Sequence, residues 1–143
     1  MSIFRINRKT DYAVRVVLSL AMHPLGTRLS TKAIQDETLV PQAFLHRIIA
    51  QLSQANLIET FPGPKGGLQL ARPADEITLR DIVEVMDGPV LISDCLKDKE
   101  ECPLAENCPV RNRWGGLQAM ILKELGRTTM SHLVLDVLNE SGT

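Results

Sequence analysis

Residues 41–72 read PQAFLHRIIAQLSQANLIETFPGPKGGLQLAR, and this stretch decides the fold. Its first half predicts an amphipathic helix, because apolar residues recur at positions i, i+3, i+4 and i+7. The apolar stripe consists of Leu45, Ile48, Ile49 and Leu52. Pro41 suits the first turn of this helix, where its missing N–H costs nothing. The other side of the helix carries polar, basic and small residues, which indicates a face in contact with water or with a polar partner.

The second half of the stretch predicts a β-hairpin. Two short apolar runs, residues 57–61 and 68–73, flank the turn-rich sequence PGPKGG. Two more helices are predicted upstream, over 11–23 with Thr10 as N-cap, and over 31–39 with Ser30 or Thr31 as N-cap. Three helices followed by a hairpin form a winged helix-turn-helix. The predicted fold class is therefore mainly α with a small β-hairpin wing.

Charge is distributed unevenly along the chain. Residues 1–72 carry nine Lys/Arg and four acids, a net charge of +5, whereas residues 73–143 carry seven Lys/Arg and thirteen acids, a net charge of −6. A basic half indicates a polyanionic partner. Together with the wing and the third helix, this favours binding to double-stranded DNA, although an amphipathic helix with an ordinary solvated face would show the same apolar spacing.

The candidate DNA contacts come from four places in the predicted domain. A major-groove reader needs small, polar or basic side chains on its outer face, and basic residues nearby bind phosphates. The candidates are Gln42, Ala43, His46 and Arg47 on the third helix, Lys32 on the second, Lys65 in the wing, and Arg5, Arg8 and Lys9 before the first.

All three cysteines lie within CLKDKEECPLAENC, residues 95–108. The segment is rich in acids and turn residues, which makes purely structural, buried cysteines an unattractive explanation. Gaps of six and five residues do not match the paired knuckles of structural zinc sites. An iron–sulfur cluster or another metal, and thiols that switch by forming disulfides, both remain open on spacing alone.

The remaining sequence predicts helices on either side of this segment. One follows Thr78, with Asp81 completing a capping box, and ends at Gly88-Pro89. After Cys108 a long helix over 109–126 has an apolar stripe, and it contains Gly115-Gly116, which would be costly unless another backbone packs closely. A second copy of the chain is the simplest partner for this helix. A short helix and a frayed tail complete the chain.

These features divide the chain into three predicted parts. They are a winged helix-turn-helix domain with its following helix (1–88), a cysteine segment (89–108), and a dimerisation helix with a C-terminal helix (109–143). No apolar run approaches twenty residues, and the N-terminus lacks the features of a signal peptide, so we expect a cytoplasmic protein with no membrane contact. No nucleophile–base pair, phosphate loop or paired carboxylates stand out, so we do not expect an enzyme.

Taken together, KTDYAVRVVLSLA, the helix–wing run from Phe44 to Gly88, and three cysteines followed by a tryptophan resemble the IscR/NsrR family of iron–sulfur winged-helix transcription regulators. The resemblance spans about residues 5–138. It implies a cytoplasmic homodimer with crossed long helices that binds a palindromic DNA operator.

The resemblance also implies a ligand set for the cluster. Cys95, Cys102 and Cys108 would be three of its ligands. The fourth ligand in IscR is a histidine three residues after the last cysteine, a position occupied here by Arg111, which cannot serve. In NsrR-type members it is an aspartate at the opening of the first helix, donated by the other subunit, and Asp11 falls at that position. The ligand set thus resembles that of NsrR, and a 4Fe–4S cluster is expected rather than a 2Fe–2S cluster.

The expected function is a dimeric transcriptional regulator, expected to be a repressor, whose operator affinity is gated by an iron–sulfur cluster. The cluster would sense nitric oxide, oxygen or redox state, or iron–sulfur status. Two alternatives remain: a thiol-based redox or metal-responsive regulator without a cluster, and a small cluster-carrying protein that does not bind DNA. An aspartate in the first turn is also ordinary helix-dipole complementarity, so Asp11 has a purely structural alternative role.

Overall fold

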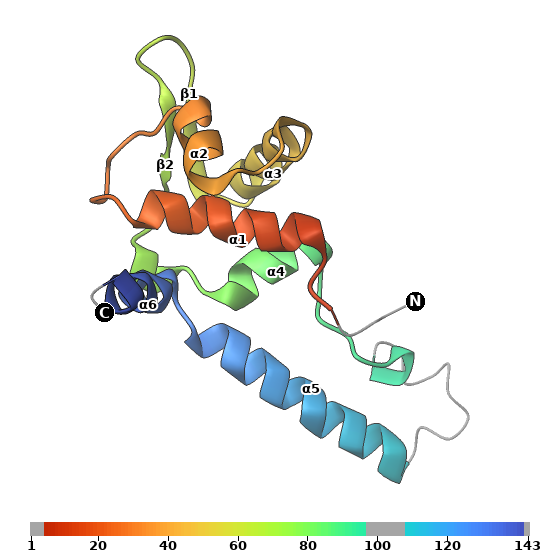
Figure 1. The fold of residues 1–143 in the computed structure, drawn as a ribbon. Helices are drawn as coiled ribbons and strands as arrows, with labels where there is room; N and C mark the ends of the chain where they lie inside the picture. Colours follow the sequence, from red (N-terminus) through yellow and green to blue (C-terminus); the bar gives the residue numbers. More distant parts are fainter. Residues whose placement is uncertain (1–4, 97–107, 142–143) are drawn as a thin grey trace.

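A computed structural model describes residues 5–96 and 108–141. Within these ranges the chain folds into helices with one two-stranded sheet (Figure 1). The elements in order are α1 (Arg8–Ala21), α2 (Thr31–Thr38), α3 (Gln42–Gln54), β1 (Ile58–Phe61), β2 (Gly67–Leu70), the 3₁₀ turn η1 (Ala74–Glu76), α4 (Leu79–Asp87), η2 (Asp94–Leu96), α5 (Pro109–Arg127) and α6 (Met130–Ser141). The predicted class, mainly α with a small hairpin wing, is confirmed.

The start of α1 differs from the sequence prediction. The N-cap is Asn7, whose side-chain oxygen accepts a hydrogen bond from the Thr10 backbone N–H at 2.8 Å. Thr10 lies inside the helix and is fully buried, and its hydroxyl donates to a carboxylate oxygen of Asp87 at 2.6 Å. The prediction of Thr10 as N-cap was wrong because the buried hydroxyl bonds to the end of α4 instead of to its own helix.

The other helix starts agree with the sequence prediction. Ser30 caps α2 by accepting from Ala33 N at 3.0 Å, and Pro41 is the residue immediately before the first residue of α3. The predicted capping box of α4 is present, since Thr78 and Asp81 each accept a hydrogen bond from the other's backbone N–H. Short polar side chains therefore define the starts of α2 and α4, whereas α3 follows a proline without a side-chain cap.

The wing is built on an antiparallel pair of strands. In its register Ile58 lies opposite Leu70 and Phe61 lies opposite Gly67. Leu29, in the connection from α1 to α2, forms an isolated antiparallel bridge to Leu68, so this connection pairs with β2 at one residue. Both hydrogen bonds of the bridge are present, at 2.9 and 2.8 Å. The connection between α1 and α2 is thus tied to the wing.

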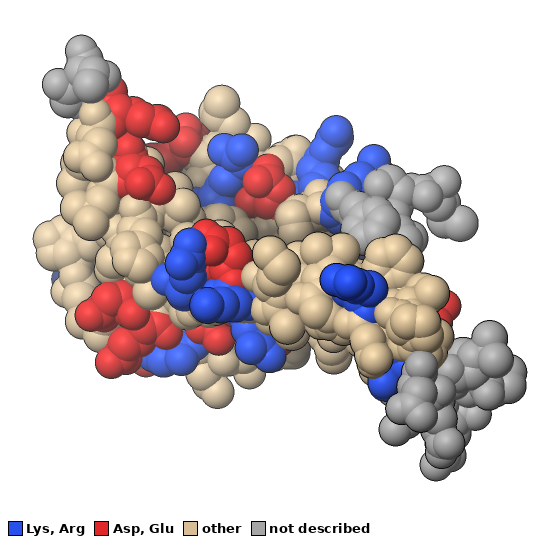
Figure 2. All heavy atoms as spheres, turned by 90° about the horizontal axis from the view of Figure 1, so that it is seen from below, with Lys and Arg blue, Asp and Glu red and all other residues tan. Residues whose placement is uncertain are grey.

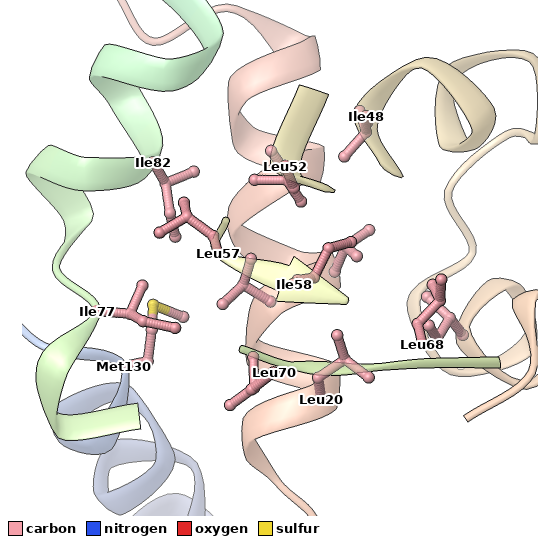
Figure 3. Close-up of a cluster of buried hydrophobic side chains, with 14 of the residues drawn as sticks. Leu20, Ile48, Leu52, Leu57, Ile58, Leu68, Leu70, Ile77, Ile82 and Met130 are labelled. Atoms are coloured by element: carbon pink, nitrogen blue, oxygen red, sulfur yellow. The ribbon is translucent and has the colours of Figure 1, made fainter. Parts of the chain in front are cut away.

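The core is aliphatic, as the 3% aromatic content predicted. It gathers one face each of α1, α3 and α4 with alternate residues of the two strands (Figure 3). Fully or almost fully buried members include Val16, Val17, Ile34, Leu45, Ile48, Leu52, Leu57, Ile58, Ile77, Ile82 and Met130. The predicted stripe of α3 is therefore the buried one, except that Ile49 is only partly covered.

The C-terminal helix α6 returns to this core. Met130, its first residue, is completely buried, and its backbone N–H donates to the Ile77 carbonyl at 2.9 Å. Thr78 and Thr129 pair as an isolated bridge, and the Leu79 N–H donates to Thr128 O at 3.0 Å. The end of α5 is consequently anchored beside the start of α4.

In contrast, α5 projects away from the rest of the molecule (Figure 1). None of its residues is buried. Figure 2 views the molecule from the side on which α5 lies, and acidic and basic side chains are mixed over this face with uncharged surface between them. Among the described helices, none is long and apolar enough to cross a membrane.

Candidate nucleic-acid interface and cysteine segment

A groove of about 760 Å³ lies between the start of α2, the outer face of α3 and the wing. Lys32 and His46 line it together with hydroxyl groups and the turn of the wing. The full lining is Ser30, Thr31, Lys32, His46, Ile49, Thr60, Phe61, Pro62, Gly63, Pro64, Gly66, Gly67 and Leu68. None of these lining residues is acidic, so the groove suits an anionic ligand.

The outer face of α3 presents the side chains that the sequence singled out. Gln42, Ala43, His46 and Arg47 are all exposed, whereas Leu45 and Ile48 between them are fully buried. Lys32 is exposed in the first turn of α2. The structure therefore brings the α2 and α3 candidates together on one side of the domain, with one basic side chain from each helix along the groove or its rim.

The wing carries Lys65 at its exposed turn. Two glycines directly after it are required by close backbone contacts. A Cβ on Gly66 would lie 2.0 Å from the Phe61 carbonyl oxygen, and one on Gly67, where φ is +140°, would lie 2.6 Å from the Leu29 carbonyl oxygen. The Gly-rich part of PGPKGG therefore fixes the shape of the turn that presents Lys65.

The basic residues at the N-terminal end of the chain do not line this groove. Arg5 is exposed beside Val83, Ile121 and Leu125, so it lies toward α5 and not along the groove. Arg8 and Lys9 belong to the first turn of α1, and Arg8 lines a shallow surface hollow with Asp11. None of these three predicted DNA contacts lines the groove between α3 and the wing, although Tyr12, in the next turn of α1, contacts Phe44 of α3 with ring centres 5.4 Å apart.

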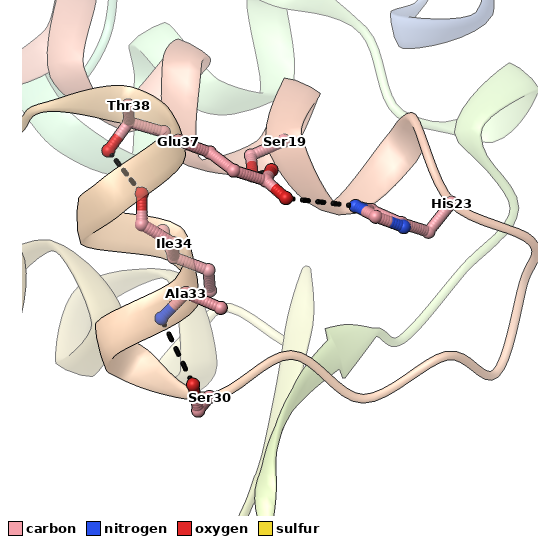
Figure 4. A network of polar contacts seen from close by, with 7 residues as sticks. All are labelled: Ser19, His23, Ser30, Ala33, Ile34, Glu37 and Thr38. Atoms are coloured by element: carbon pink, nitrogen blue, oxygen red, sulfur yellow. Dashed lines mark hydrogen bonds and ion pairs between the residues drawn. The ribbon is translucent and has the colours of Figure 1, made fainter.

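A polar contact between α1 and α2 fixes the position of the helix-turn-helix (Figure 4). The Glu37 carboxylate accepts a short hydrogen bond from the Ser19 hydroxyl, and its other oxygen lies 3.3 Å from His23 Nε2. Ser19 is buried, and the other two side chains are partly exposed. Sequence patterns could not reveal this contact, because it joins residues on different helices.

Asp11 lies in the first turn of α1 with half of its side chain exposed. Its carboxylate pairs with Arg15 one turn later, at 3.0 Å. Since Asn7 caps the helix, Asp11 is not needed for capping. In Figure 1 the first turn of α1 and the Cys108 end of α5 lie well apart, so one chain does not bring Asp11 and Cys108 together.

The two ends of the cysteine segment are held on the same helix. Cys95 belongs to η2, where the neighbouring Leu96 contacts α5 at Gly115, with Leu96 Cδ2 3.7 Å from the position of a Cβ. Cys108 is the N-cap of α5, and its Sγ accepts from the Arg111 N–H at 3.5 Å. Cys102 lies outside the described residues. Among the described residues no three His, Cys, Asp or Glu side chains gather as a metal site requires.

Between Val110 and Met120, α5 exposes large apolar side chains. Val110 and Met120 are more than half exposed, and Trp114 and Leu117 are about 40% exposed. A Cβ on Gly116 would meet nothing within 4 Å among the described residues, so the chain by itself contains no close backbone contact that would explain this glycine. Apolar surface of this kind is typical of an interface with another chain.

Arg28 is a candidate that the sequence analysis missed. Its guanidinium carbon lies 3.6 Å from the centre of the ring of Phe61, the last residue of β1 before the turn of the wing. The only available signal was a basic residue in a loop, and its position depends on the pairing of that loop with β2.

Comparisons with known proteins agree with this architecture. A family model named Rrf2, described as an iron-dependent transcriptional regulator, matches residues 6–136. Protein aau3 of Rhizobium meliloti is 37% identical over 123 residues, which cover 85% of this chain and 74% of that protein. The structure of CymR, the global cysteine regulator of B. subtilis, superposes with a TM-score of 0.75 at 26% identity, covering 92% of this chain and 97% of CymR. T. potens IscR has the same fold, with a TM-score of 0.74 at 23% identity over 94% of this chain and 89% of IscR.

Proposed function

This chain belongs to the Rrf2 family of transcriptional regulators, and we propose that it acts as a homodimer whose affinity for a palindromic DNA operator is gated by an iron–sulfur cluster. The observation that carries the DNA-binding part is the groove between α3 and the wing, lined by Lys32 and His46 without an acidic residue. In a winged helix-turn-helix the third helix enters the major groove while the wing meets the adjacent backbone.

The dimer is supported by the exposed face of α5. Trp114 and Leu117 lie on it with about 40% of their surface exposed. Two such faces packed together would bury apolar surface and set the spacing of the two α3 helices, which a palindromic operator requires. The three parts proposed for the chain, 1–88, 89–108 and 109–143, then correspond to DNA reading, sensing and dimerisation.

The donor set fits a cluster that is completed across the dimer. Cys95, Cys102 and Cys108 would supply three thiolates, the usual protein ligands of such clusters, from a segment whose two ends lie on α5. Asp11 would supply the fourth ligand from the other subunit, as in the NsrR type, because its carboxylate is half exposed and far from Cys108 of its own chain. When bound, a 4Fe–4S cluster supplies a centre that changes state with nitric oxide, oxygen or iron supply.

The residues of this chain would convert that state into DNA affinity. Cys108 is the N-cap of α5, and the far end of α5 is hydrogen-bonded to the segment that begins α4. Asp11 is in the first turn of α1, the helix that Glu37 joins to α2. A bond from Asp11 to the partner's cysteine segment would thus fix one reading head relative to the other.

The test begins with anaerobic purification of the full chain, followed by iron and sulfide analysis and visible absorption. We expect a brown protein that binds DNA, with binding altered by nitric oxide or oxygen. Asp11→Ala should weaken cluster retention without unfolding, because an exposed i,i+4 ion pair contributes less than about 0.5 kcal/mol. Glu84→Ala, which removes the matched exposed pair with Arg80, is the control and should retain the cluster. A colourless protein that cannot be reconstituted refutes the cluster but not DNA binding.

A thiol-based regulator without a cluster is the second candidate. It is favoured by Cys108, a free, partly exposed cysteine at the N-terminus of α5, where its sulfur can be reached by another thiol. Reversible disulfide formation within the cysteine segment would then be the signal. If iron-free protein changes its DNA affinity on oxidation, and Cys108→Ser abolishes that change, this candidate replaces the cluster.

A further inference from the structure

Arg28 lies on the outer face of the wing sheet, although it does not belong to the wing. Arg28 comes from the connection between α1 and α2 and is exposed. Its guanidinium carbon lies 3.6 Å from the centre of the Phe61 ring, close enough for a cation–π contact. Phe61 is the last residue of β1, where the strand enters the turn of the wing.

The strand pairing explains how Arg28 reaches this ring. Leu29 pairs with Leu68 and packs toward the core, so the preceding residue lies on the opposite, outer face. Phe61 lies opposite Gly67 in the register, and Gly67 has no side chain. In this antiparallel pairing Arg28 lies beside Gln69, so its side chain reaches diagonally to the ring on the far strand, next to the position where β2 has only a glycine.

The guanidinium is held in place without being neutralised. None of the carboxylates in the described residues forms an ion pair with Arg28. Glu59, on the same face of the sheet, accepts a hydrogen bond from Gln69 at 3.1 Å instead. A stacked guanidinium keeps its N–H edges free and loses little side-chain freedom when those edges bind an anion.

The ring that positions Arg28 also belongs to the groove. Phe61 is one of its lining residues, as are His46 of α3 and Lys32 of α2. We propose that Arg28 binds a DNA phosphate beside the wing and that Phe61 is its positioning residue. This inference rests on the proposed DNA-binding function, and it adds to the interface a cation from outside both α3 and the wing turn.

The experiment measures fluorescence anisotropy of a labelled mixed-sequence duplex of about 30 base pairs, long enough for two half-sites, with the full chain in ~50 to ~200 mM KCl. We expect Arg28→Ala to weaken binding about tenfold and to reduce the salt slope by about one. Arg28→Lys should keep the slope but lose part of the affinity, since it retains the charge without the planar stack. Phe61→Leu should weaken binding less than Arg28→Ala.

Arg80→Ala is the matched control, because it removes the same charge from α4, on the other side of α1 from the wing (Figure 1). Circular dichroism of each variant shows whether it is folded. If Arg28→Ala does not fold, the DNA affinity of Arg28→Lys shows whether the guanidinium contributes to binding. If Arg28→Ala and Arg80→Ala bind DNA with equal affinity while the wild type binds normally, the role of Arg28 is refuted and the DNA-binding proposal stands. No salt-dependent binding by the wild type overturns the DNA-binding proposal as well. A loss that depends on the base sequence of the duplex overturns the phosphate assignment.

Discussion

Replacing Gly67 by alanine should break the junction between the wing and the α1–α2 connection. The added Cβ would lie 2.6 Å from the carbonyl oxygen of Leu29 and 3.0 Å from its carbonyl carbon. That oxygen accepts the Leu68 N–H at 2.8 Å, so moving it away also disrupts the bridge. The backbone at Gly67 has φ of +140°, a conformation that alanine rarely adopts.

The magnitude follows from these two effects. Strain from the positive φ costs about 1–3 kcal/mol. Loss of the two bridge hydrogen bonds between Leu29 and Leu68 costs about 1 kcal/mol each. If the backbone relieves part of the strain as the bridge opens, the free energy of unfolding should fall by about 3 kcal/mol, equivalent to roughly 10 °C in Tm for a chain of this size.

Thermal and urea unfolding of the full chain, followed by circular dichroism, measure this loss. Gly63→Ala is the matched control, because Gly63 also has positive φ, +90°, but its Cβ would meet nothing within 4 Å. It should cost only about 1 kcal/mol. Equal stabilities of the two variants, or a Gly67→Ala protein as stable as the wild type, would refute the reasoning. DNA binding by Gly67→Ala should also weaken at temperatures where it remains folded, because Gly67 lines the groove.

Three further predictions concern other parts of the chain. Leu39→Gly should raise the free energy of unfolding by about 0.5–1 kcal/mol in urea titrations, because Leu39 is 81% exposed and has φ of +59°, whereas Leu25→Gly, exposed but without positive φ, should lower it. Asp87→Ala should lower the free energy of unfolding by about 2 kcal/mol in the same assay, because the buried Thr10 hydroxyl loses its partner. In a protein that already carries Thr10→Val, the same Asp87→Ala change should lower it by less. Trp114→Arg should shift the chain toward the monomer in light scattering while its Tm in the monomeric state changes little; an unchanged dimer would contradict the proposed interface.

Much of the fold follows from local sequence signals. The PGPKGG turn between two apolar runs predicts the hairpin, and the Thr78–Asp81 pair predicts the start of α4, because each signal acts within a few residues. The start of α1 could not be predicted in this way. Both Asn7 and Thr10 are good capping residues, and the choice depends on Asp87, which lies nearly eighty residues further along the chain.

The candidate site also contains residues that local sequence predicts and residues whose positions depend on distant segments. The exposed face of α3, with His46 and Arg47, follows from helical periodicity alone. The position of Arg28 depends on which strand the α1–α2 connection pairs with, and local sequence does not show this. The position of Arg5, beside residues of α4 and α5, likewise depends on segments far along the chain. The prediction of a cluster in residues 95–108 falls largely outside the described residues and stays a prediction.

The unequal anchoring of α5 gives it the mechanics of a lever. Its C-terminal end is fixed by hydrogen bonds from Leu79 to Thr128 and from Met130 to Ile77, while Cys108 begins the end that projects from the helical domain. A 19-residue helix is about 28 Å long, so a tilt of about 5° at the fixed end displaces the other end by roughly 2.5 Å. Read in the opposite direction, a shift of about one bond length at Cys108 rotates the fixed end by only about 3°. A rearrangement at the cysteines would therefore rotate the end of α5 that contacts the DNA-binding domain by only a few degrees.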